Sequence, residues 1–406
     1  MKVNKWTTSL AALGLVSIPA VALADESDKM NNVWTALSST TIKGYVNTSM
    51  HWDTGTGNAT PPAFAFNSGK QDGFNLNAAK VTIEKPLDEA QWAAGYTLDL
   101  IFGPDATTYA TSLDSAGDAS PAAIKQAYVA LRAPVGNGLD FKVGVFDTII
   151  GYESFDAGNN PNYTRSWGYT IEPTTHTGVL MSYQVSSAVS VSAGIANTFG
   201  PAINARANPP KAESYKTYMA STALTAPDDW GFIGGSTLYF GVINGFNVAT
   251  GTQTSWYVGA TMNTPVKNLK VGASFDYLGT SDNTTQNVFV SGYANAWALY
   301  TSFQATEKLS LHLRGEYAST DTSLLGTGVM DTTGNSEIFS LTGTIQYDLW
   351  ANVLSRLEIR WDHLAGDGDM FGYGGDFAGG GGTGVTPASD DLRNSVMIAA
   401  NFIYKF

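Results

Sequence analysis

Apolar and polar residues alternate with a period of two along most of the chain after Thr40. The clearest runs lie at 92–102, 139–145, 269–277, 309–317, 339–349 and 357–361, where every second residue is apolar or Gly. Successive side chains of a β-strand point to opposite faces, so this period predicts strands with one apolar and one polar face. The polar positions in or beside these runs carry Asp99, Lys142, Lys270, Asp276, Arg314, Glu316, Arg356, Glu358, Arg360 and Asp362.

The connections between these strands alternate in length. We place sixteen strands at 40–52, 73–85, 91–102, 123–133, 138–146, 177–185, 188–199, 214–226, 231–245, 252–264, 268–279, 290–304, 307–319, 336–348, 353–364 and 393–406. Connections after even-numbered strands are short, such as 86–90 and 305–306, whereas most of those after odd-numbered strands are long, such as 103–122. A soluble β-sandwich has no reason to keep this alternation. A transmembrane barrel has it, with its apolar face in lipid and its polar face on the lumen.

The sequence therefore predicts one all-β domain at 40–406, a transmembrane antiparallel β-barrel of about 16 strands with short periplasmic turns and long extracellular loops. An even strand number places both termini on the periplasmic side and pairs the first strand with the last, so that no edge stays open. The segments 40–52 and 288–304 are less regularly patterned, and a count two higher or lower stays open.

The N-terminus indicates export. Residues 1–24 contain Lys2 and Lys5, an apolar run and a final Ala-Leu-Ala, which are the features of a cleaved signal peptide. Residues 25–39 would form a polar periplasmic leader. Cleavage would change the formal net charge from −13 to −15 because two lysines leave. This acidity argues against nucleic acid as a partner and favours cations in an aqueous pore. The sequence has no cysteine, which excludes disulfides and thiolate metal sites.

Several stretches resemble known outer-membrane proteins. The chain ends on the alternating aromatics Phe402, Tyr404 and Phe406, which resemble the closing strand of a bacterial outer-membrane barrel. The segments GFNLN (73–77), LIFGPDA (100–106), NYTRS (162–166) and THTG (175–178) resemble the OmpL-like family of putative β-barrel porins. The resemblance implies a porin in the outer membrane of a Gram-negative-type bacterium. The chain departs from the family at Thr97-Leu98-Asp99, where the family usually has an Arg before the Asp.

The connection at 147–176 is the longest, and it is dense in charged and aromatic residues. Long ordered loops are often functional, and the resemblance to general porins implies that this third long loop folds into the lumen. We expect it to form a pore constriction, and carboxylates there would select by charge. This predicts cation-biased passive diffusion of small hydrophilic solutes or ions; a loop that only caps the barrel is the alternative. The constriction residues would be Tyr152, Glu153, Asp156, Arg165 and Glu172.

Other functions compete with the channel. A structural or adhesive surface protein with a blocked lumen is one alternative, and the mixed charges of 307–319 and 353–364 could equally form a paired structural network. A hydrolase would need Ser, His and a carboxylate grouped together. The four histidines are scattered at His51, His176, His312 and His363, so we expect no enzyme. We expect no cofactor or metal either, since the Asp and Gly residues at 366–369 lack EF-hand spacing. Membrane lipid is the expected partner, and a homotrimer stays open.

Overall fold

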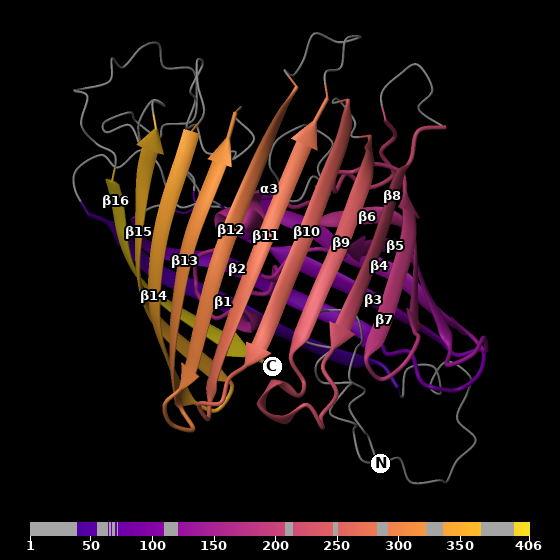
Figure 1. Cartoon of the computed structure of the whole chain (residues 1–406), viewed down its shortest axis with the longest axis horizontal. Coiled ribbons are helices and arrows are strands. Elements are labelled where there is room, and N and C mark those ends of the chain that lie inside the picture. The colour runs from indigo at the N-terminus through magenta and orange to yellow at the C-terminus, as the bar shows by residue number, and fades with distance from the viewer. Residues whose placement is uncertain are drawn as a thin grey trace.

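The computed structural model describes residues 39–54, 64, 66, 70, 72–108, 121–207, 214–246, 251–281, 291–321, 336–366 and 394–406. They form a closed barrel whose strands follow one another around the wall in chain order (Figure 1). The strands are β1 (Thr41–Asp53), β2 (Gly73–Lys85), β3 (Ala94–Phe102), β4 (Ala122–Ala133), β5 (Leu139–Asp147), β6 (Thr175–Gln184), β7 (Val189–Ala196), β8 (Thr217–Thr225), β9 (Thr237–Phe246), β10 (Thr252–Asn263), β11 (Leu269–Thr280), β12 (Gly292–Gln304), β13 (Leu309–Thr320), β14 (Ser336–Trp350), β15 (Val353–Gly366) and β16 (Asn394–Lys405).

The first and last strands close the barrel. β1 pairs with β16 in antiparallel register from Tyr45↔Lys405 to Asp53↔Met397. The Phe406 amide donates to the Gly44 carbonyl at 3.0 Å, and the Gly44 amide donates to the Phe406 carbonyl at 2.9 Å. Every other neighbouring pair is antiparallel too, so the wall exposes no unpaired edge. The predicted all-β antiparallel barrel of sixteen strands is confirmed.

Most strands begin and end within about three residues of the predicted positions. The largest difference is at β9, which was expected to begin at 231 and begins at Thr237. Gly231–Ile233 form a short 3₁₀ turn, η3, and Gly231 has a φ of +65° that a strand residue does not adopt. The predicted signal peptide (1–24), residues 25–38 of the leader and the Gly-rich stretch 367–384 lie outside the described residues.

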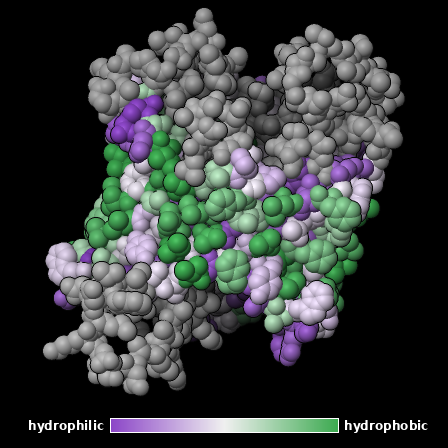
Figure 2. Space-filling view, turned by 180° about the vertical axis from the view of Figure 1, so that it is seen from behind, coloured by the Kyte–Doolittle hydropathy of each residue, from purple (hydrophilic) through white to green (hydrophobic). Residues whose placement is uncertain are grey.

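The outer wall is apolar. Figure 2 shows a band of hydrophobic residues around the middle of the barrel, with hydrophilic residues near its two ends. Outward side chains such as Leu299, Trp256 and Leu313 are 50–68 % exposed, whereas the side chains that alternate with them are buried or face the interior. Such a band is larger than the apolar patches of soluble monomers and fits contact with hydrocarbon. None of the helices among the described residues is long and apolar enough to cross a membrane.

Candidate pore constriction

The segment between β5 and β6 lies inside the barrel. Its short helix α3 (Trp167–Ile171) begins after Ser166, whose hydroxyl accepts a hydrogen bond from the Tyr169 amide at 3.2 Å and so caps the helix. In Figure 1 the label α3 stands within the outline of the barrel, in its upper half. The segment makes most of its contacts with β11 to β16, β1 and β2, and it also reaches β9 and β10 through Ile149 and Tyr152. We call residues 148–174 the inner loop.

Arg314 of β13 is the first anchor of the inner loop. Its side chain is fully buried and forms ion pairs with Glu153 of the loop (Nη1–Oε1 2.8 Å) and Glu316 of its own strand (Nε–Oε1 2.6 Å). It also donates to the carbonyl of Thr164 at 2.7 Å. A buried cation is tolerated only when its donors are satisfied by such partners. Arg314 therefore holds the loop backbone against β13.

Trp167 and Arg360 form the second anchor. The Trp167 indole N–H donates to Asp362 Oδ1 at 2.9 Å and to Ser340 Oγ at 2.8 Å. The Arg360 guanidinium lies 5.5 Å from the Trp167 ring centroid, pairs with Asp362 and donates to the Arg165 carbonyl at 2.6 Å. An indole donor, a cation–π contact and a buried ion pair thus meet at one place. They fix the start of α3 against β14 and β15.

Arg356 and Glu358 of β15 form the third anchor by binding loop backbone. Arg356 donates to the carbonyl of Ala157 at 2.9 Å and also to the carbonyl of Asn160. Glu358 accepts from the amides of Tyr163 at 2.6 Å and Thr164 at 2.9 Å. Loop carbonyls and amides that would lose water inside the barrel are therefore paired with charged wall residues.

The six predicted lumen-lining charges of β13 and β15 thus lie beneath the inner loop and form one network with it. All six are inward-facing and at most 6 % exposed; they are Arg314, Glu316, Arg356, Glu358, Arg360 and Asp362. These contacts form the paired structural network that the sequence analysis gave as one possibility for the mixed charges. Sequence reasoning did not single out Trp167 or Tyr163 as anchors, and their only signal was the aromatic density of the segment.

Two cavities remain beside the inner loop. One of about 520 Å³ lies against β2 to β6 and is lined by Asp99, Lys142 and the loop residues Tyr152, Glu153, Asp156 and Glu172. The other, of about 700 Å³, lies against β8 to β14 and is lined by Lys270, His312 and the rings of Tyr152, Tyr239, Tyr257 and Tyr300. The predicted residues Asp99, Lys142 and Lys270 therefore line space that the loop does not fill.

Several charges around the smaller cavity are paired. Lys80 bridges Asp156 of the loop (2.8 Å) and Asp99 of β3 (3.2 Å), and Lys125 contacts Asp147 at the end of β5 (2.5 Å). Burial opposes ionisation of Asp156, but the charges of Lys80 and Lys125 outweigh it and lower its pKa to about 2. Asp156 is therefore an anion throughout the physiological range.

Arg165 is buried under the loop and does not reach a carboxylate among the described residues. Its side chain donates to the carbonyls of Tyr163 at 3.1 Å and Phe155 at 2.6 Å. The guanidinium also lies over the rings of Phe64 (5.3 Å) and Tyr169 (5.5 Å). In the structure it stabilises the loop itself.

Glu172 lies half-buried near Asp276 of β11, at the end of the inner loop. Gly151 and Gly168 make this approach possible, since a Cβ on Gly151 would meet the Glu172 carboxylate and one on Gly168 would meet that of Asp276. Burial, followed by the negative charge of Asp276, raises the pKa of Glu172 well above its usual range. The loop end is therefore packed most favourably when Glu172 is protonated.

This arrangement predicts a stability that falls with pH. The unfolded chain ionises Glu172 near pH ~4.3, whereas the folded chain holds the proton to higher pH. The Glu172 contribution is fully present below the unfolded pKa and is lost as pH rises through the folded one. Glu172→Gln should match wild type at pH 4 and exceed it at pH 8 in the urea midpoint of unfolding. Glu89→Gln, in an exposed turn, is the control, and equal midpoints of wild type and Glu172→Gln at pH 8 would contradict the prediction.

Comparisons with known proteins agree with this architecture. The anion-selective porin from Comamonas acidovorans superposes with a TM-score of 0.58 at 12 % identity, over 91 % of this chain and 99 % of that one. The outer-membrane channel DcaP of Acinetobacter baumannii superposes with a TM-score of 0.56 at 11 % sequence identity, over 90 % of this chain and 97 % of that one. The trimer form of Vibrio cholerae OmpT superposes with a TM-score of 0.54 at 12 % sequence identity, over 90 % of this chain and 99 % of that one. At these identities the likeness shows the fold alone.

Sequence comparison identifies the family. No curated protein is significantly similar to the chain. The family model described as putative beta-barrel porin-2, OmpL-like, matches residues 39–406, which is the whole barrel and confirms the resemblance seen in the sequence. The chain therefore belongs to the OmpL-like putative beta-barrel porin-2 family and is an outer-membrane porin.

Proposed function

We propose that the protein is a passive diffusion channel for small hydrophilic solutes across the outer membrane, narrowed by the inner loop. The observation that carries the proposal is the pair of cavities that remain beside a firmly anchored loop. A sixteen-stranded barrel is wide enough to hold an aqueous channel. The loop fills part of that width, and the remaining space sets the size limit. The protein has no catalytic role in this proposal.

The rigidity of the loop supports its role as a constriction. Glu153 and Arg165 are buried: Glu153 pairs with Arg314 of the wall, and Arg165 donates to the Phe155 carbonyl of the loop. They therefore hold the loop in position. Tyr152 borders both cavities, and its ring stacks on Tyr300 at 4.0 Å. Asp156 and Glu172 border the smaller cavity. A solute would therefore meet Tyr152 and Asp156 directly, while the other residues hold them in place.

A modest cation preference is part of the proposal. It rests on the formal net charge of −13 and on carboxylates that border the smaller cavity, of which the Asp147 side chain is 44 % exposed and that of Asp156 27 %. Their lysine partners, Lys80 and Lys125, are at most 8 % exposed. A passing ion would therefore meet more of the negative partner in each pair. Because Asp147 and Asp156 are each paired with a lysine, the preference should be small and should weaken with salt.

The test is the reversal potential of single channels across a KCl gradient. Wild type should prefer cations near 0.1 M salt, where the Debye length is ~10 Å, and lose the preference at 1 M, where it is ~3 Å. Asp147→Asn with Asp156→Asn should shift the potential towards anions, because Lys80 and Lys125 remain. Glu89→Gln removes a charge from an exposed turn and should shift nothing. An unshifted double variant would remove these carboxylates from selectivity, and absence of conductance in wild type would favour an adhesive protein with a blocked lumen.

A homotrimer of barrels embedded in lipid is included in the proposal. The Vibrio cholerae OmpT structure is described as a trimer. The same association through the lipid-facing wall would leave each channel intact, since the cavities lie inside the barrel.

A further inference from the structure

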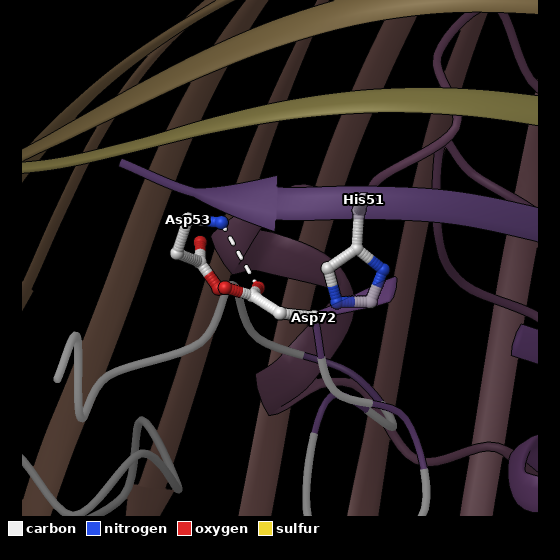
Figure 3. A group of neighbouring side chains, drawn as sticks. All are labelled: His51, Asp53 and Asp72. Carbon is white, nitrogen blue, oxygen red and sulfur yellow. Dashed lines mark hydrogen bonds between the residues drawn. The ribbon is translucent and has the colours of Figure 1, made fainter. Parts of the chain in front are cut away.

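We propose that His51, Asp53 and Asp72 bind one divalent transition-metal cation of the Zn²⁺ type, at the end of the barrel that carries the long loops. The three residues supply an imidazole nitrogen and two carboxylates, and their candidate ligand atoms all lie within 4.8 Å of one another. Figure 3 shows the His51 ring and the two carboxylates gathered on one side of β1. The sequence analysis did not predict this site, because Asp72 is far from His51 along the chain.

Strand geometry explains how the three residues meet. His51 and Asp53 are two positions apart on β1, so both point into the barrel. Gly73 pairs with His51 in the β1–β2 register, which places the preceding residue, Asp72, beside the end of β1. The Asp53 amide donates to Asp72 Oδ1 at 2.9 Å and fixes that carboxylate near the other two side chains. The ligand set is therefore preorganised by backbone rather than by flexible side chains.

Unsatisfied polar atoms in the cluster point to a cation. The His51 side chain is only 1 % exposed, and its hydrogen bonding within the described residues is limited to one long contact of 3.4 Å between Nδ1 and Asn75. In Figure 3 its other ring nitrogen turns towards Asp72. Asp53 Oδ1 is buried without a hydrogen-bond partner. A buried carboxylate oxygen next to a second carboxylate is costly unless a shared proton or a bound cation joins the two.

The nearest ammonium does not supply that charge. Lys70 is buried and its Nζ lies 2.7 Å from Asp105, with the Phe66 ring 4.4 Å away. Phe66 also packs edge-on against the His51 ring, with 5.2 Å between centroids. The lysine is thus packed against an aromatic ring and paired with another carboxylate.

The donor set selects the class of cation. Ca²⁺ prefers six to eight oxygen ligands and Mg²⁺ keeps several waters in an octahedral shell, whereas imidazole nitrogen favours Zn²⁺, Ni²⁺ and their neighbours. One nitrogen and two carboxylates match the three protein ligands of open zinc sites, with water at the fourth position. Asp72 is solvent-exposed, so the cluster can be reached from the aqueous side.

The experiment is Zn²⁺ binding to the purified, folded full-length barrel in detergent, measured by isothermal titration calorimetry. We expect one equivalent of ZnCl₂ per chain, and a visible Co²⁺ absorption spectrum from the same site. Asp72→Asn removes an exposed ligand and should weaken Zn²⁺ binding at least tenfold while the barrel stays heat-modifiable on gels. His51→Ala should do the same. His312→Ala is the matched control, because His312 faces the lumen beside Ser302 and belongs to no carboxylate cluster among the described residues.

The Zn²⁺ titrations of wild type and variants distinguish three outcomes. Loss of the single equivalent in Asp72→Asn and His51→Ala, with His312→Ala unchanged, supports the site. Stoichiometric binding that persists in both variants, or no binding to wild type, overturns it. Displacement of Zn²⁺ by an equal concentration of Ca²⁺ would overturn the assignment of the cation class.

Discussion

Replacing Arg314 with Met should loosen the inner loop and raise the single-channel conductance. Glu153 and Glu316 are each only 6 % exposed. The change removes the guanidinium with which both carboxylates form ion pairs. Removing one partner of a buried ion pair typically costs ~3–5 kcal/mol because the remaining charge stays desolvated. The chain can avoid that cost by moving Glu153 and the loop into water. We expect a lower urea midpoint and a larger, noisier conductance in a planar bilayer.

The same substitution at Arg132 is the matched control. Arg132 also pairs with a carboxylate, Asp140, but the two side chains are 20 % and 31 % exposed and lie outside the inner loop. An exposed pair of this kind contributes ~0–1 kcal/mol. Arg132→Met should therefore leave the urea midpoint nearly unchanged. Because Arg132 also lines the smaller cavity, it is compared with Arg314→Met by stability and not by conductance. If both variants behaved alike, burial beneath the loop would not be what makes Arg314 important.

The wall of the barrel could be predicted from the sequence because its physics is local. Each strand needs one face for lipid and one for the interior, so apolar and polar residues alternate along its sequence. The β9 boundary was missed because Trp230 to Ile233 continue the apolar character of the strand, while the positive φ of Gly231 breaks its backbone. Composition alone does not reveal that break.

The interior could be predicted only in outline. The sequence marked the loop and the wall charges as separate features, and nothing in either shows which part of the wall the loop covers. The strand register explains why the wall needs partners from the loop. Arg314 stands opposite Thr342, and Thr342 stands opposite Arg360, so two buried arginines flank one position of β14. Two cations so close need acceptors from elsewhere, and the carbonyls of Thr164 and Arg165 meet that need. Three-dimensional closure of the barrel, rather than sequence spacing, brings those acceptors in.

Introducing Arg on the two faces of one strand should give opposite results. Leu299 of β12 is outward and 68 % exposed, so Leu299→Arg would place a charge in hydrocarbon at a cost of ~2–4 kcal/mol if it lies near the midplane. Ser302 of the same strand borders the larger cavity, where water can solvate a guanidinium, and Ser302→Arg should be tolerated. The measurement is the urea midpoint of each variant folded into lipid vesicles. In detergent micelles, which deform around a charge, the difference should shrink. Equal loss of stability at both positions in vesicles would mean that Ser302 does not face water, and the cavity it borders could then not be part of a channel.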